Sequence, residues 1–76
     1  MTIRLAIAGA GGRMGQALIE AALGSPDFAI AAALDVAGSA AIGRDAGERF
    51  GRTTGAIVGA DVDAAVRSAD VLIDFT

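Results

Sequence analysis

The sequence predicts an α/β fold built around a parallel β-sheet. Three observations support this prediction: short aliphatic runs of strand length, an apolar pattern at helical spacing between two of them, and glycine or proline at the breaks. Strands and helices alternate along the chain, which is typical of parallel strands joined by crossover connections. We therefore expect a doubly wound α/β architecture.

The first three elements form a predicted strand–helix–strand unit. Ile3–Ala8 is a mostly apolar run that ends at a glycine, as expected for a strand buried on both faces. A second apolar run, Phe28–Leu34, completes a right-handed crossover and should be parallel to the first. The helix between them is predicted from apolar residues at helical spacing and from a glycine and a proline at its end: Met14, Leu18, Ala21, Ala22, Gly24 and Pro26.

The second half of the chain carries a long loop and shorter elements. Residues 36–55 lose the apolar pattern, and we expect a loop with a helical turn near residues 45–50. A third short strand is predicted at Ala56–Val58. Asp61 is a candidate N-cap for a second helix, and Val71–Phe75 is predicted to be the fourth strand.

Composition limits the classes of function. The chain has 76 residues, of which 54% are apolar, so a packed core is favoured over disorder. It contains no cysteine and no histidine, which excludes thiol chemistry, disulfides and the common zinc sites from this segment. The net charge of −3, with basic residues scattered singly, argues against nucleic acid or an anionic membrane as partner. The first apolar run is too short for a signal peptide or membrane span, so a cytoplasmic location is expected.

A glycine-rich segment separates the first strand from the first helix. We predict that Gly9 allows a tight turn off the strand, that Gly12 lets a pyrophosphate approach the backbone, and that Gly15 allows close packing of helix on strand. No Ser, Thr, Asp or Asn caps the helix, so its first N–H groups and its positive dipole end remain available to a phosphate. These features predict the N-terminal βαβ half of a Rossmann-like dinucleotide-binding domain.

An acidic residue at the end of the second strand supports the same interpretation. Asp35 lies 20 residues after Gly15, where a carboxylate can accept hydrogen bonds from the adenosine ribose. The glycine spacing departs from the usual GxGxxG, since Met14 lies three residues after Gly11, so the argument depends on the strand–loop–helix context and the acid. The simpler alternative is a structural turn with a solvated acid. Arg13 is either a solvated loop residue or a phosphate ligand.

The chain resembles the dihydrodipicolinate reductase family along its whole length. The resemblance is carried by the segments Ile7–Gly15, Ala32–Asp35, Asp45–Glu48 and Val71–Thr76. The GxxGRMG segment and the closing Asp-Phe-Thr are specific in combination, whereas other Rossmann proteins share only the first. The resemblance implies NAD(P)H-dependent reduction of 4-hydroxy-tetrahydrodipicolinate to tetrahydrodipicolinate, on the diaminopimelate route to lysine.

The resemblance also implies a set of cofactor-binding residues in the glycine segment, at the ribose-binding acid and at the last two positions. They are Gly9, Ala10, Gly11, Gly12, Arg13, Met14, Gly15, Asp35, Phe75 and Thr76. Phe75 and Thr76 would lie near the nicotinamide, whereas the residues alone would suggest a core phenylalanine and a surface threonine. The family's catalytic histidine and lysine and its substrate-binding domain lie beyond residue 76. Residues 1–76 are therefore expected to be the N-terminal part of the cofactor domain, inactive alone.

The expected cofactor is NAD(H), with NADP(H) as the alternative. Many family members carry a basic residue after the ribose-binding acid to hold the 2′-phosphate of NADP(H), and here that residue is Val36. Asp35 would repel a 2′-phosphate, so NAD(H) is favoured unless Arg13 or Arg44 compensates. The resemblance further implies a dicarboxylate heterocycle as substrate, bound through the other domain, and a homotetramer.

Two other functions remain open. One is a non-catalytic NAD(P)-binding or regulatory module, since none of the family's catalytic residues occurs here. The other is a different amino-acid-pathway dehydrogenase, such as aspartate or homoserine dehydrogenase, which shares the strand, glycine loop and helix. The Asp-Phe-Thr ending argues against both. An isolated segment would expose the edge of an unfinished sheet, so weak stability or association is expected.

Overall fold

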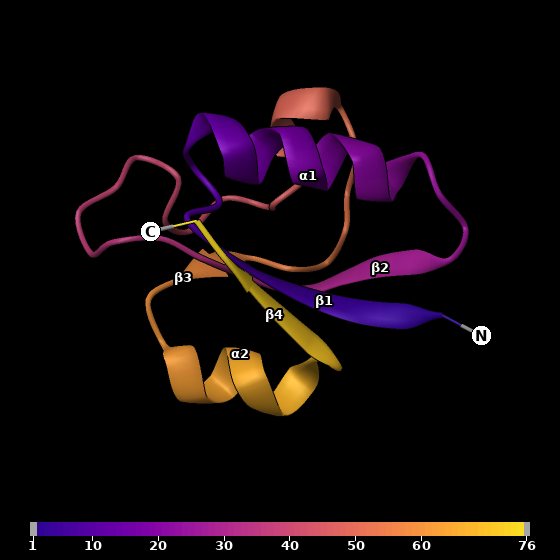
Figure 1. Cartoon of the computed structure of the whole chain (residues 1–76). Coiled ribbons are helices and arrows are strands. Elements are labelled where there is room, and N and C mark those ends of the chain that lie inside the picture. The colour runs from indigo at the N-terminus through magenta and orange to yellow at the C-terminus, as the bar shows by residue number, and fades with distance from the viewer. Residues whose placement is uncertain (1, 76) are drawn as a thin grey trace.

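Four parallel strands in the order β3-β2-β1-β4 form the centre of the computed structural model, which describes residues 2–75 (Figure 1). The strands are β1 (Ile3–Ala8), β2 (Phe28–Leu34), β3 (Val58–Gly59) and β4 (Val71–Asp74). The helices are α1 (Arg13–Leu23), α2 (Val62–Ser68) and the short 3₁₀ helix η1 (Glu48–Phe50). Helices α1 and α2 cover opposite faces of the sheet (Figure 1). The predicted α/β class and parallel sheet are confirmed.

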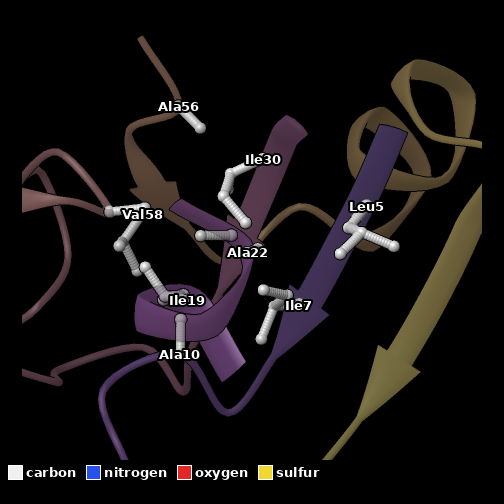
Figure 2. Close-up of a cluster of buried hydrophobic side chains, with 10 residues drawn as sticks. Leu5, Ile7, Ala10, Ile19, Ala22, Ile30, Ala56 and Val58 are labelled. Atoms are coloured by element: carbon white, nitrogen blue, oxygen red, sulfur yellow. The ribbon is translucent and has the colours of Figure 1, made fainter. Parts of the chain in front are cut away.

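Strands β1 and β2 have the predicted bounds and form the centre of the sheet. They pair in parallel, with Ile7 opposite Ala33. The last four residues of β1 are buried because α1 and α2 cover the two faces of the strand, and this is why its sequence is apolar without alternation. The larger core cluster lies between α1 and the sheet, where Figure 2 shows Ile19 beside the side chains of Ala10 and Val58.

The buried face of α1 differs from the predicted one. Gly15, Ile19 and Ala22 face the core, whereas Met14 is 61% exposed and Ala21 is also exposed. The reason is that Gly15, which has no side chain, packs against the preceding loop and sets the rotation of the helix. The core residues then follow at i+4 and i+7 from that glycine.

The long loop is more ordered than its composition indicates. Its predicted helical turn is confirmed as η1. The predicted strand Ala56–Val58 is wrong by two residues, because Ala56 accepts a hydrogen bond from the N–H of Ala46 (2.8 Å) and Ile57 forms an antiparallel bridge with Asp45. These backbone groups are therefore used for the loop, and parallel pairing with β2 begins only at Val58.

The carboxylate of Asp45 holds this loop together through hydrogen bonds to residues 47–55. It accepts hydrogen bonds from the backbone N–H of Thr54 (2.9 Å), the Thr54 hydroxyl (3.0 Å), and the N–H groups of Gly47 (2.8 Å) and Gly55 (2.9 Å). These hydrogen bonds, with that of the Thr54 N–H the largest, hold the pKa of Asp45 below its ordinary value. Asp45 thus ties the two ends of residues 45–55 together.

The second crossover ends at the edge strand β4. The carboxylate of Asp61 accepts a hydrogen bond from the N–H of Ala64 (3.2 Å), which confirms it as the N-cap of α2. Strand β4 ends at Asp74, one residue before the predicted end, since Phe75 leaves the strand. No helix within residues 2–75 is long and apolar enough to cross a membrane.

Arg4 and Asp70 join the amino ends of β1 and β4. The Asp70 carboxylate accepts a hydrogen bond from the Arg4 N–H (2.9 Å) and pairs with the Arg4 guanidinium (3.2 Å). Hydrogen bonds from the Arg4 side chain, and then from its backbone, hold the pKa of Asp70 below its ordinary value. Both side chains are exposed, so the pair fixes the register of the two strands more than it stabilises the fold.

Candidate functional site

The glycine segment forms a tight turn between β1 and α1. Gly9 has a φ of +80°, a conformation that residues with a Cβ rarely adopt, and its carbonyl accepts a hydrogen bond from the N–H of Gly12 (3.0 Å). A Cβ on Gly15 would lie 2.9 Å from the Cα of Ala10 and from the carbonyl carbon of Gly9, and closer still to the Gly9 oxygen. The predicted conformational role of Gly9 and the predicted packing role of Gly15 are both confirmed.

Helix α1 begins without a side-chain cap. Its N-cap is Gly12, in an extended conformation with φ −84° and ψ 174°. Within residues 2–75, the backbone N–H groups of Arg13, Met14 and Gly15 have no hydrogen-bond acceptor. The Arg13 side chain is exposed and has no ion-pair partner in the same range. Three N–H donors, the positive helix end and a guanidinium therefore lie at one place, an arrangement suited to an anionic group.

Ala10 fastens the glycine segment to the sheet. Its side chain is fully buried, and its N–H donates a hydrogen bond to the carbonyl of Leu34 at the end of β2 (2.9 Å). Its carbonyl accepts a hydrogen bond from the Nε2 atom of Gln16. The backbone N–H of Ala10 is therefore not available to a ligand, and Ala10 holds the glycine segment in place through its buried side chain and its backbone hydrogen bonds.

Gln16 is a residue of the site that was not predicted from the sequence. This residue lies in the first turns of α1 and supports the glycine segment through its bond to the Ala10 carbonyl. Its Oε1 atom is buried, and no group in the described part of the chain donates to it. A glutamine after the last glycine has no distinctive spacing, so only the folded structure reveals this contact.

Asp35 connects the glycine segment to the loop after β2. Its Oδ2 atom accepts hydrogen bonds from the Gly11 N–H (3.0 Å) and the Ser39 hydroxyl (3.0 Å), and its Oδ1 atom accepts one from the Val36 N–H (2.8 Å). A Cβ on Gly11 would overlap Oδ2, so a glycine is required there for the approach of the acid. A carboxylate accepts about four hydrogen bonds, so Asp35 keeps room for one more.

A cavity of about 440 Å³ opens between α1 and the loop that follows β2, and its lining includes Gly11 and Ser39, the two residues that donate to Oδ2 of Asp35. Its volume falls within the range of roughly 300–1,000 Å³ typical of small-molecule sites. Arg44 in its wall pairs with Glu48 at 2.7 Å. Polar residues in the lining include Gln16, Ser39, Arg44, Asp45, Glu48 and Arg49.

Phe75 lies against the glycine segment. Its N–H donates a hydrogen bond to the Ala8 carbonyl (3.1 Å), and a Cβ on Gly9 would lie 3.3 Å from the Phe75 backbone. The Phe75 side chain is 39% exposed, so it is not the core residue that its type alone suggests. The predicted Phe75 and Gly9 thus meet at the carboxyl ends of β4 and β1. Thr76 lies outside the described residues.

The site occupies the point where the strand order reverses. From β1 the chain proceeds outward through β2 to β3, and β4 then pairs with the other side of β1. In open parallel sheets, ligands bind at the carboxyl ends of the strands at this reversal, and the glycine turn and Asp35 lie there. Fold and site together define the N-terminal half of a Rossmann-like, dinucleotide-binding type of domain.

The chain belongs to the family described as dihydrodipicolinate reductase, N-terminus, whose model matches residues 3–76. It is 57% identical over 74 residues to the 4-hydroxy-tetrahydrodipicolinate reductases of Ralstonia nicotianae and Ralstonia pickettii. The identity to the protein of the same name from Laribacter hongkongensis is also 57%. Each match covers 97% of this chain and 28% of the relative, so the chain spans just over a quarter of these relatives' length.

Proposed function

We propose that residues 1–76 form the N-terminal part of the cofactor-binding domain of an NAD(P)H-dependent 4-hydroxy-tetrahydrodipicolinate reductase. The whole protein would reduce 4-hydroxy-tetrahydrodipicolinate to tetrahydrodipicolinate in the diaminopimelate pathway to lysine. The observation that carries the proposal is the uncapped start of α1, next to a glycine turn to which Asp35 is hydrogen-bonded. The names of the relatives support the choice of substrate.

The pyrophosphate would bind at the start of α1. The N–H groups of Arg13, Met14 and Gly15 would donate to its oxygens, and the Arg13 guanidinium would balance its charge. Gly12 has no Cβ, so the phosphate can approach the backbone closely. The bound nicotinamide would supply the hydride, and the residues of the glycine turn would bind the pyrophosphate and thereby orient the cofactor.

The two ends of the cofactor would extend in opposite directions from the glycine turn. One ribose hydroxyl would donate to the remaining acceptor position of Asp35, and the adenosine would lie along the cavity beside it. The nicotinamide half would pass Gly9 toward Phe75. The exposure of Phe75 supports this assignment, because a residue buried in the core could not contact a ligand. The role of Thr76 on the nicotinamide side is proposed from the family resemblance alone.

NADH is the proposed cofactor, in preference to NADPH. Val36 supplies no positive charge to a 2′-phosphate, and the charge of Arg44 is already balanced by Glu48 at 2.7 Å. A phosphate about 4 Å from the Asp35 carboxylate would be repelled by roughly 1–4 kcal/mol per unit of charge, between bulk water and protein-surface dielectric. This would outweigh the weak attraction of a paired arginine.

The remaining length of the relatives leaves room for the other parts of the enzyme. We assign to it the catalytic residues, the substrate-binding domain that holds the dicarboxylate heterocycle, and the contacts of a homotetramer. The described residues contain no group of three acidic side chains that could hold a metal ion. A cytoplasmic location is proposed, as for a biosynthetic enzyme that uses a soluble nucleotide.

The substitution Gly12→Ser in the intact protein tests the pyrophosphate site. The extended backbone of Gly12 suits a serine cap, and a Cβ there would lie 3.4 Å from the Gly9 oxygen, an ordinary contact. The serine Oγ would accept a hydrogen bond from one of the free N–H groups at the start of α1 and stabilise the fold by a few tenths of a kcal/mol to about 1 kcal/mol. The same bond would compete with the phosphate, so NADH affinity should fall by about 10-fold.

The predicted gain in stability and the predicted loss of NADH affinity can be measured separately. Urea denaturation should show equal or greater stability, while calorimetric titration shows weaker NADH binding. Gly24→Ala, at the other end of α1, is the matched control and should leave affinity unchanged. A stable Gly12→Ser variant with unaltered NADH affinity would overturn the proposed pyrophosphate site.

A further inference from the structure

Ser39 lies between the ribose-binding acid and the cavity. Its hydroxyl is 3.0 Å from Oδ2 of Asp35, and both Ser39 and Gly11 line the cavity wall. We propose that Ser39 is a positioning residue that sets the preference for NADH over NADPH by holding the Asp35 carboxylate toward the ribose. The inference rests on the proposed function of the site and adds a residue that the sequence analysis did not identify.

The hydrogen-bond pattern fixes the direction of the Ser39 proton. The Oγ atom of Ser39 accepts a hydrogen bond from the Ala41 N–H (3.2 Å). Asp35 as a carboxylate can only accept, so the single hydroxyl proton of Ser39 is donated to Oδ2. The hydroxyl is therefore committed to the acid.

The backbone holds Ser39 in place for this contact. Its N–H donates to the Val36 carbonyl (3.0 Å), and its carbonyl accepts from the Ile42 N–H (3.2 Å). Two successive turns therefore converge on Ser39, one from each side. The side chain is partly buried, so water competes only weakly for its hydroxyl.

Ser39 limits how the Asp35 carboxylate can rotate. The last torsion of an aspartate is broad and roughly two-fold, so the carboxylate turns easily unless its oxygens are held. Oδ2 is held by two donors from different segments, Gly11 and Ser39, and Oδ1 by the Val36 N–H. Only an acceptor position on Oδ1 remains for the ribose. Ser39 thereby selects which oxygen the ligand meets.

This constraint affects the two cofactors in opposite ways. A fixed carboxylate is already oriented for a ribose hydroxyl, so NADH loses little entropy at this contact. The same fixed charge cannot turn away from a 2′-phosphate, so NADPH meets the full repulsion. Without the hydroxyl of Ser39, Asp35 would bind the ribose less well and would also repel a phosphate less.

The test compares Ser39→Ala and Ser39→Thr in the intact protein, with steady-state kinetics for both cofactors. In Ser39→Ala the KM for NADH should rise about 5–10-fold, the scale of one ordinary hydrogen bond, because the lost bond acts on the ligand only through Asp35, and kcat should be unchanged within about two-fold. The KM for NADPH should stay the same or fall. Ser39→Thr keeps the hydroxyl and should restore the wild-type ratio of kcat/KM values.

Ser68→Ala is the matched control. The Ser68 hydroxyl likewise donates one hydrogen bond, to the Ala65 carbonyl (3.0 Å), but it lies in α2, which packs on the other face of the sheet. This variant should leave both KM values unchanged. An equal rise of KM for both cofactors in Ser39→Ala, or a ratio that Ser39→Thr fails to restore, would overturn the positioning role.

The outcomes separate this inference from the proposed function. A wild-type protein that uses NADH, together with a Ser39→Ala variant whose cofactor ratio is unchanged, would refute the inference and leave the proposed function in place. A folded wild-type protein that binds neither cofactor by calorimetric titration would refute both.

Discussion

The substitution Gly15→Ala should damage the fold at the point where α1 meets the glycine turn. The new Cβ would lie 2.9 Å from the Ala10 Cα and from the Gly9 carbonyl carbon, whereas ordinary van der Waals contact begins at 3.4 Å. It would overlap the Gly9 carbonyl oxygen as well. All of these are backbone atoms of a turn that is held by hydrogen bonds of the Gly9 and Ala10 carbonyls and of the Ala10 N–H, and none is the end of a flexible side chain that could move aside. The helix must shift by at least half an ångström.

Two opposing effects determine the magnitude. Forcing an extra carbon into a packed site costs about 1–3 kcal/mol. Replacing glycine by alanine within a helix returns up to about 1 kcal/mol through helix propensity. The cost exceeds the gain because the overlap involves several backbone atoms, and we expect a net loss of about 1–2 kcal/mol.

Urea denaturation of the intact protein measures this loss, followed through the unfolding transition of the cofactor domain. Gly24→Ala is the control, because a Cβ at this C-cap position of α1 would have its nearest neighbour at 3.6 Å. The control should change stability by no more than about 0.5 kcal/mol. A Gly15→Ala variant as stable as the control would refute the argument that close packing requires this glycine.

Two further predictions concern charged residues of the long loop. Hydrogen bonds to the Asp45 carboxylate, with the largest effect from the Thr54 N–H, lower the pKa of Asp45 in the folded protein. The stability that Asp45 contributes is therefore present above the ordinary aspartate pKa of about 3.9, and it is lost as the pH falls through the lower pKa of the folded state. Asp45→Asn should lower stability at pH 7 by about 1–3 kcal/mol and flatten its acid dependence, measured by denaturation from pH 7 to 3; an unchanged acid dependence would contradict this. Arg44→Ala removes an exposed pair with Glu48 and should change stability by less than about 1 kcal/mol without lowering NADPH affinity, measured by denaturation and titration; a large loss of NADPH affinity alone would contradict this and show that Arg44 serves the 2′-phosphate.

The parts of the fold that depend on local sequence could be predicted. The bounds of β1 and β2 follow from apolar runs with clear ends, and Asp61 caps α2 through a contact three residues away. Gly9 was predictable in the same way, since a strand that turns sharply into a helix requires a positive φ. These features depend on residues close together in the chain.

Other features depend on contacts that the sequence does not display. The exposure of Met14 follows from the packing of Gly15 on Gly9, which rotates the helix face. The late start of β3 follows from the antiparallel bridge between Asp45 and Ile57. Each requires knowledge of which distant segments meet.

The candidate site divides along the same line. The glycine turn and the acid could be predicted because their spacing follows from the strand–helix–strand unit. The Ser39 contact with Asp35 could not, because a serine in a Gly- and Ser-containing loop has no special spacing. Gln16 was missed for the corresponding reason, since its partner is a backbone carbonyl.

The proposed function requires that the glycine turn and Asp35 bind a nicotinamide dinucleotide. Calorimetric titration of the intact protein with NADH and with NADPH, at matched ionic strength and alongside Asp35→Ala, measures this binding. NADH should bind more tightly than NADPH, and NADH binding should weaken by about 1–3 kcal/mol in the variant. No binding to the folded protein, or an NADH affinity that the variant leaves unchanged, would contradict the proposed function.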